Sequence, residues 1–267
     1  QISKLLLYNA ICKGVKLSIF SKANIVAGED FNRWLVPPIS ISIHLCIGSV
    51  YAWSMFNPAL TTSLGVVTSS ANDWSLSDVV WIFSTAIVFL GLAAAFAGKW
   101  LEEVGPRLVG FVSACLWGGG FLIGSVGIFF HELFLVYLGY GVLGGCGLGL
   151  GYVSPVSTLI RWFPDRRGMA TGMAIMGFGG GAMIGAPLIS YLLELYYVAP
   201  VYLGSASDVI LQTIDGIRYT DINGVMTEVV VLAASEVTNN TQLAGVYVVG
   251  SGDTGAGMTF VTCLLYT

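Results

Sequence analysis

Charged side chains are scarce in this chain, because Asp, Glu, Lys and Arg together make up only 10% of its 267 residues. In a typical soluble domain about a quarter of the residues are charged. Apolar residues instead reach 55%, and the mean hydropathy is +0.81. This scarcity excludes an ordinary soluble protein and favours a chain surrounded by lipid.

The motifs of several function classes are also missing. The five cysteines show no metal-ligand spacing and four of them fall in apolar runs, so we interpret them as packing residues and expect no metal site. No phosphate-binding loop occurs, which leaves ATP-driven transport without support. We find no nucleophile placed beside a base, and we expect no enzyme activity, no cofactor and no nucleic-acid partner.

Much of the chain consists of long apolar runs. A transmembrane helix needs about 20 mainly apolar residues, and backbone groups in lipid must bond within their own segment, which favours helices here. Five windows are long enough: 35–56, 77–97, 108–130, 133–160 and 169–193. A sixth opens at 257 and runs to 267, about half the length of a span. We therefore expect a fragment, with a complete five-span protein as the alternative.

These windows predict four regions in the chain. They are an N-terminal segment (1–34), five transmembrane helices (35–197), a loop domain (198–256) and the truncated start of a sixth helix (257–267). In the loop domain, Asn223-Gly224 stands between alternating or β-branched runs, which is a hairpin signal. We expect a small, ordered, α/β-like extramembrane domain there. Its acidic residues either keep it soluble or disfavour anions near the entrance.

The Lys and Arg residues indicate how the chain is oriented. Ten of the eleven precede the first window or lie in the second-to-third and fourth-to-fifth connections, and only Arg218 lies on the opposite side. The positive-inside rule then predicts a cytoplasmic N-terminus, in the plasma membrane or an endomembrane. Asn239 begins an Asn-x-Thr glycosylation pattern on the predicted outer side, although chance is an alternative reading.

Glycines recur on one face of the fourth and fifth windows. Small residues at this spacing let two helix backbones approach closely in lipid. The set comprises Gly141, Gly145, Gly149, Gly177, Gly181 and Gly185. We interpret these positions as helix-packing sites, and two consecutive glycine-rich spans also suggest helices that slide. We expect close packing at Gly168 and Gly172 as well.

Two connections resemble a known family. The stretch "GKWLEEVGPR" (98–107) is similar to a signature of the major facilitator superfamily, with Glu103 departing from its usual basic position. The stretch "RWFPDRRG" (161–168) and "HLCIGSVYAWSMF" (44–56) resemble the oxalate/formate antiporter-like branch. The resemblance assigns a cytoplasmic gate motif to Gly98, Glu102, Gly105, Arg107, Arg161, Asp165, Arg166, Arg167 and Gly168. We expect Glu102 or Asp165 to pair with one of these arginines.

What the resemblance implies is an all-α membrane protein of twelve helices, of which this chain supplies the N-terminal six-helix bundle. Substrate would lie near the midplane between two halves that open alternately to each side. The implied partners are the lipid bilayer, a small organic anion and the missing C-terminal six-helix half. A partial antiporter signature in the fifth window, ending at Pro187, favours exchange weakly.

The substrate site has to be sought among uncharged residues, because no window has a charged residue in its interior. Aromatic rings with a polar tip and hydroxyl groups are the remaining groups that suit a cavity. The candidates are Tyr51, Trp53, Tyr152, Ser154 and His44, each with a packing role as the alternative. We expect a secondary transporter of mono- or dicarboxylates, and a membrane receptor or sensor built on a transporter fold is the alternative.

Overall fold

The computed structural model describes residues 27, 28, 30–237 and 242–266. Within this part, five helical stretches are long and apolar enough to cross a membrane. They are Arg33–Met55, Leu76–Val104, Pro106–Phe129, Leu133–Trp162 and Arg167–Tyr196. Each coincides with one predicted window, and the second continues about two turns past its window. The predicted N-terminal segment and Asn239 lie mainly or wholly outside the described residues.

Several spans are built from more than one helix type. The first joins an α-helix to a 3-10 helix, and the fourth contains a π-helical stretch. In chain order the helices are η3 (Arg33–Leu35), α2 (Val36–Gly48), the 3-10 helix η4 (Ser49–Met55), α3 (Asn57–Thr61), α4 (Leu76–Val104), α5 (Pro106–Phe129), α6 (Leu133–Val136), the π-helix η5 (Tyr137–Gly144), α7 (Gly145–Trp162), α8 (Arg167–Tyr196), α9 (Ala256–Cys263) and η6 (Leu264–Tyr266).

Local sequence explains where the helices begin. The Ser75 hydroxyl accepts a hydrogen bond from the Asp78 backbone N–H at 3.3 Å and so caps α4. The junction of α4 and α5 turns at Gly105, whose φ of +88° favours glycine, and α5 then starts at Pro106. Because of this tight junction, Gly98 and Glu102 of the gate motif lie in the last turns of α4, and Arg107 lies in the first turn of α5.

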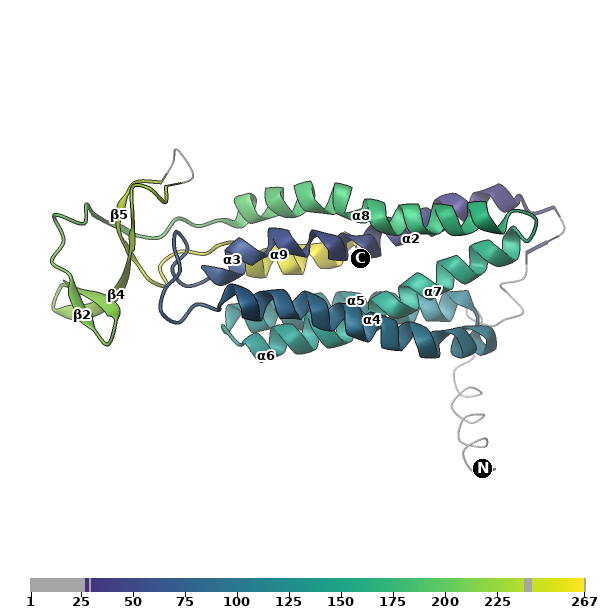
Figure 1. The fold of residues 1–267 in the computed structure, drawn as a ribbon, viewed down its shortest axis with the longest axis horizontal. Coiled ribbons are helices and arrows are strands. Elements are labelled where there is room, and N and C mark those ends of the chain that lie inside the picture. Colours follow the sequence, from purple (N-terminus) through teal and green to yellow (C-terminus); the bar gives the residue numbers. More distant parts are fainter. Residues whose placement is uncertain (1–26, 29, 238–241, 267) are drawn as a thin grey trace, which may run out of the picture.

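The helices form a bundle with a small sheet beyond one end (Figure 1). We call this end, where α8 leads into the strands, the sheet end. The opposite end, where α4 meets α5 and α7 meets α8, we call the arginine end, because it carries Arg107, Arg161, Arg166 and Arg167.

Glycine faces bring two pairs of helices into close contact. On the fourth span, a Cβ atom added at Gly145 would lie 2.6 Å from the Ala86 carbonyl oxygen of α4, and Gly149 has a similar approach. On α8, a Cβ atom at Gly181 would lie 2.4 Å from the carbonyl carbon of Gly48 in α2. Gly141 faces α4 in the same way, and Gly177 and Gly185 face the first span. Close backbone approach of this kind is how helices pack in lipid.

Close packing at Gly168 and Gly172 is not found, and that expectation was wrong. A Cβ atom added at either position would meet nothing within 4 Å. Both residues lie in the first two turns of α8, near the arginine end, where no other described element packs against that side of the helix. They therefore differ from the glycines deeper in α8, which contact the first span.

The sheet end carries five antiparallel strands in the order β1-β5-β4-β3-β2. The strands are β1 (Tyr202–Gly204), β2 (Gln212–Ile214), β3 (Ile217–Ile222), β4 (Val225–Leu232) and β5 (Gly245–Val248). The predicted hairpin is present, because Asn223 and Gly224 join β3 to β4 with φ of +55° and +85°. The α/β-like domain expected here is wrong in one respect. Its described residues between α8 and α9 form strands and no helix.

The sheet is attached to the helices at defined points. Val198 and Asp253 exchange two backbone hydrogen bonds of 2.8 and 2.9 Å just beyond the end of α8. The Gly250 backbone N–H donates to the Leu64 carbonyl oxygen at 2.9 Å, in the connection between α3 and α4. Val67 from that same connection packs against the small core of β4 and β5. The sheet therefore rests on the connection between the first and second spans.

Candidate functional site

An aromatic cluster joins three spans inside the bundle. Phe178 of α8 lies at its centre, with ring centroids 5.1 Å from Tyr51 of η4 and 5.1 Å from Tyr152 of α7. His44 of α2 lies 5.6 Å from Tyr152 and 6.4 Å from Phe178. These contacts are mostly edge-to-face, which is a favoured arrangement for aromatic rings. Three of the five predicted cavity residues therefore come together around one ring.

The members of this cluster differ in exposure. Tyr51 is 47% exposed, Tyr152 is half-buried and His44 is fully buried. His44 Nδ1 lies 3.0 Å from the Ser40 carbonyl oxygen one turn earlier, which fixes the ring against its own helix. The two tyrosines are thus the accessible members of the cluster, and His44 is its buried member. Phenol hydroxyls so placed can donate hydrogen bonds to a carboxylate oxygen.

Trp53 and Ser154 lie away from this cluster. Trp53 is 4% exposed, and its ring centroid lies 4.4 Å from that of Tyr140 in the core toward the sheet end. Ser154 is also buried, and its hydroxyl donates to the Pro106 carbonyl oxygen at 3.2 Å, which ties α7 to the start of α5. Both residues thus make packing contacts in the structure, and their role in a substrate cavity stays a prediction.

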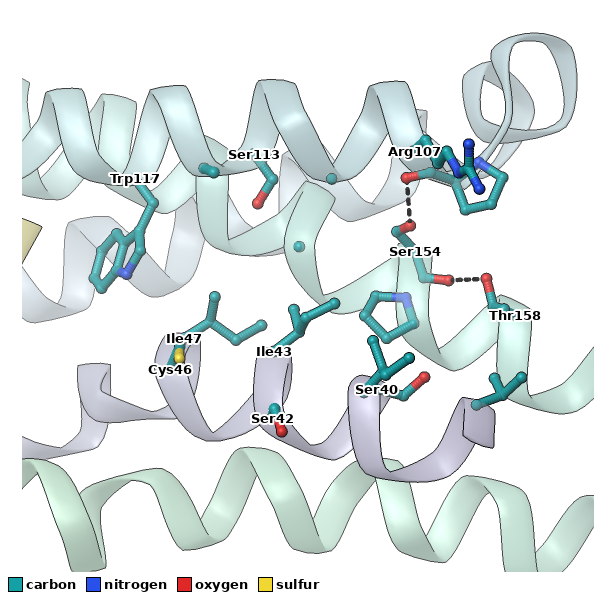
Figure 2. Close-up of a pocket in the computed structure, with 17 residues that line it drawn as sticks. Ser40, Ser42, Ile43, Cys46, Ile47, Arg107, Ser113, Trp117, Ser154 and Thr158 are labelled. Atoms are coloured by element: carbon teal, nitrogen blue, oxygen red, sulfur yellow. Dashed lines mark hydrogen bonds between the residues drawn. The ribbon is translucent and has the colours of Figure 1, made fainter. Parts of the chain in front are cut away.

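Ser154 borders an apolar groove of about 510 Å³ between α2, α5 and α7. Figure 2 shows this groove, with Ile43 and Ile47 of α2 facing Ser113 and Trp117 of α5. Four of the five hydroxyl groups along it donate to backbone carbonyl oxygens of the chain, and Ser113, for example, donates to Gly147 at 2.7 Å. The lining is mainly apolar, and Arg107 at the arginine end is its one charged residue.

A smaller pocket of about 380 Å³ connects Tyr152 to the arginine end. It is lined by residues of α7 together with Glu102 of α4. Glu102 Oε1 lies 3.1 Å from Arg161 Nη2, so the expected pairing of this acid with an arginine is present. The structure therefore brings the two family-like connections side by side and places Tyr152 at the edge of the same pocket.

Asp165 pairs with Arg33, an arginine that sequence reasoning did not assign to the gate. Arg33 donates two hydrogen bonds to the Asp165 carboxylate, at 2.9 and 3.2 Å, while Arg166 Nε stays 3.8 Å away. Arg33 lies just before the first span, 132 positions from Asp165. Its guanidinium carbon also lies 4.9 Å from the centroid of the Phe163 ring. No spacing in the sequence indicates this contact.

The Arg33 hydrogen bonds determine the electrostatics of this pair. They hold the pKa of the Asp165 carboxyl below its ordinary value of 3.8, because they stabilise its ionised form. Two pairs of rings lie at the same contact, since Trp34 packs on Phe163 and Phe31 on Trp162 with centroids 5.2 Å apart in both cases. We call Arg33, Asp165 and these four aromatic residues the N-terminal clasp.

Comparisons with known proteins agree with this arrangement. The chain is 33% identical over 151 residues to the "Uncharacterized MFS-type transporter YhjX" of Escherichia coli (strain K12), covering 57% of this chain and 35% of that one. It is 26% identical over 189 residues to "Apicoplast pyruvate carrier 1" of Toxoplasma gondii, covering 60% and 35%. It is 29% identical over 174 residues to the "Oxalate:formate antiporter" of Oxalobacter formigenes, covering 64% and 38%.

The matched regions thus span little more than a third of the length of these relatives. The sequence pattern of the Major Facilitator Superfamily matches residues 44–207, which is more than half of the chain. That region contains the aromatic cluster, the Glu102–Arg161 pair and Asp165. The helical bundle, its five spans and this match lead to one conclusion: the chain is an integral membrane protein of the Major Facilitator Superfamily.

Proposed function

We propose that this chain is the first half of a secondary active transporter that carries small mono- or dicarboxylates by alternating access. The observation that carries the proposal is the aromatic cluster, in which Tyr51 and Tyr152 present hydroxyl groups beside Phe178. Two relatives whose names state a substrate are a pyruvate carrier and an oxalate:formate antiporter. Pyruvate, oxalate and formate are all small carboxylates.

The two phenols are proposed to bind the carboxylate, and the Phe178 ring to contact its apolar part. The rings that contact Phe178 carry no formal charge, and Arg161, which lines the same pocket as Tyr152, is paired with Glu102. We therefore assign the cationic groups that neutralise the substrate to the second half of the transporter. We further propose that the arginine end faces the cytoplasm, where the Glu102–Arg161 pair and the N-terminal clasp keep the first bundle rigid at the face that latches against the second half. Alternating access requires such contacts to form and break.

Exchange measurements with the full-length transporter in liposomes test the proposal. We expect counterflow of labelled oxalate, formate or pyruvate, and we expect Tyr51→Phe and Tyr152→Phe each to lower it about ten-fold, the loss of one hydrogen bond to a charged group. Tyr191→Phe is the matched control, because Tyr191 lies on α8 with 60% exposure and belongs to no described cluster. Full activity in both cluster variants would contradict the proposed role of the phenols.

A receptor or sensor function has one observation in its favour, namely the folded sheet at the sheet end. Such a domain gives a second surface on which a ligand can act. The same liposome experiment separates the two functions, because a sensor binds carboxylates without carrying them across the membrane. Binding of labelled substrate with no counterflow would favour the sensor over the transporter.

A further inference from the structure

Three polar side chains meet at the sheet end, outside the membrane spans. Ser63 and Asp73 belong to the connection between α3 and α4, and His131 belongs to the turn between α5 and α6. Ser63 Oγ lies 3.1 Å from Asp73 Oδ1 and 3.1 Å from His131 Nδ1. All three side chains are half-buried. A hydroxyl group therefore bridges a carboxylate and an imidazole.

Asp73 also organises the backbone of its own connection. Its carboxylate accepts hydrogen bonds from the backbone N–H groups of Leu64 at 2.8 Å, Gly65 at 3.1 Å and Ser70 at 2.8 Å. An ionised carboxylate only accepts hydrogen bonds, so every group around it must donate. Any change in the hydrogen bond from Ser63 therefore acts on the carboxylate that holds this connection in shape.

The second nitrogen of His131 fixes the position of one hydrogen. Nε2 lies 2.9 Å from the Asn72 carbonyl oxygen, which can only accept, so Nε2 carries a hydrogen atom. The ring is held in place by stacking on Trp74, with centroids 4.5 Å apart and planes 14° apart. The backbone of His131 has a φ of +53°, an uncommon conformation for a residue other than glycine. The turn therefore presents Nδ1 to Ser63.

Counting hydrogens shows that the neutral ring leaves one bond unmade. With its hydrogen on Nε2, a neutral His131 has only an acceptor at Nδ1. Ser63 has a single hydroxyl hydrogen, which it can give either to Nδ1 or to Asp73 Oδ1. When His131 is protonated, Nδ1–H donates to Ser63 and the Ser63 hydrogen is free for Asp73. Only the protonated form makes all of these hydrogen bonds at once.

Acidic groups outnumber basic ones on the elements beside these three residues. The sequence has no Lys or Arg in 34–98 or 108–160, so these two connections offer no cation other than His131 to balance Asp73. The ionisable groups on the neighbouring elements are Asp78 of α4, Glu132 and Tyr137 beside the turn, and Arg218, Glu228 and Glu236, which border residues 68–71 from the sheet. Four of these six groups are carboxylates, and Arg218 is the one basic side chain among them.

We propose that Asp73, Ser63 and His131 form an acid-stabilised lock at the sheet end. Protonation of His131 completes the hydrogen bonds from the α5–α6 turn through Ser63 to Asp73, and so joins the first two connections of the bundle at this end. The sheet is coupled to the lock, because the Leu64 carbonyl oxygen accepts from Gly250. The lock makes all of its hydrogen bonds when His131 is protonated and one fewer when His131 is neutral.

Hydrogen exchange of the full-length chain in lipid nanodiscs tests the lock independently of transport. Backbone exchange of residues 62–73 is measured at about pH 5.5 and about pH 7.5, on either side of the range in which imidazole groups titrate, and corrected for the intrinsic pH dependence of exchange. We expect about five-fold greater protection at the lower pH, which is the factor that one hydrogen bond of typical net strength provides.

Three variants make the result specific. His131→Asn removes the titrating ring and keeps a residue that tolerates positive φ, and Ser63→Ala removes the bridge but leaves the histidine. Both should abolish the acid effect. Ser69→Ala is the matched control, because its hydroxyl donates to the Thr61 carbonyl oxygen outside the lock, and it should keep the effect. Equal protection at both pH values in the parent chain, or acid protection that survives in His131→Asn or Ser63→Ala, would overturn the proposal.

Discussion

At the scale of single residues, the difference between neighbouring glycines on α8 decides whether a side chain is tolerated. Gly181 faces α2, where an added Cβ atom would lie 2.4 Å from backbone, whereas an added Cβ atom at Gly179 would meet nothing within 4 Å. Sequence spacing correctly separated these two positions, because Gly181 belongs to the repeated face and Gly179 does not. Spacing alone did not reveal that Gly168 and Gly172 lie outside the contact between α8 and the first span.

Gly181→Ala should destabilise the bundle by about 1–3 kcal/mol, since a methyl group inserted at a close backbone contact forces the helices apart. Gly179→Ala is the matched control and should be neutral or slightly stabilising, because alanine has the higher helix propensity. Thermal unfolding of the two variants in the same detergent measures the difference. Equal unfolding temperatures would show that α2 and α8 are not in close contact.

Phe178 shows what the sequence did not reveal at this scale. It stands alone among glycines in "GFGGGA", and nothing in that run indicates that it contacts Tyr51, Tyr152 and His44. The three partners were selected from motif resemblance and side-chain chemistry. Their meeting depends on how the first, fourth and fifth spans pack, which is a long-range property and not a property of any one segment.

At the scale of elements, hydropathy predicted the five spans because an apolar run of about 20 residues has few alternatives in lipid. It did not predict the π-helix η5 (Tyr137–Gly144) or the 3-10 helix η4 (Ser49–Met55). These helices differ from an α-helix in which carbonyl oxygen accepts the hydrogen bond from each backbone N–H. The amino-acid composition does not reveal which carbonyl that is. The Asn223-Gly224 hairpin was predictable, since its turn requires positive φ at both positions.

The N-terminal clasp joins η3, the first described helix, to the connection between α7 and α8. Because Arg33 lowers the pKa of Asp165, the carboxylate stays ionised to a lower pH than an ordinary aspartate. The pair is lost only as the pH falls through this lowered pKa. The clasp should therefore be insensitive to mild acid, in contrast to the lock at the sheet end.

Exchanging the two charges tests the clasp. Arg33→Asp alone places two carboxylates together and should increase the rate at which protease cleaves the α7–α8 connection in detergent, whereas Arg33→Asp with Asp165→Arg should restore the parent rate. Lys99→Asp is a control of equal charge change elsewhere at the arginine end. A double variant that is cleaved as fast as the single variant would indicate that the ion pair does not hold the connection.

At the scale of the whole molecule, the distribution of charge predicts which end faces the cytoplasm. Cysteines introduced at Ser235, in the sheet domain, and at Glu103, at the arginine end, report the two sides. On intact cells a membrane-impermeant maleimide should label Ser235→Cys, and it should label Glu103→Cys only after permeabilisation. The parent chain is the background control, because Cys115 is exposed on α5 within a span.

Glycosidase treatment gives a second measurement of the same orientation. A mobility shift would place Asn239 on the outer side, in agreement with labelling at Ser235. Labelling of Glu103→Cys without permeabilisation would invert the proposed orientation and with it the assignment of the gate. The eleven Lys and Arg residues predict this sidedness, but nothing in the sequence indicated that one of them, Arg33, contacts the α7–α8 connection.

The backbone bridge between Val198 and Asp253 has a consequence for how this architecture tolerates change. The chain leaves α8, builds five strands and returns to the same point before α9 begins, so the bundle is joined to the sheet domain through a narrow stalk. An epitope tag or a foreign domain placed beyond this stalk, away from the contacts with Leu64 and Val67, leaves the spacing of α8 and α9 unchanged. The sheet is thus a natural grafting position, where length can vary without altering the register of the membrane helices.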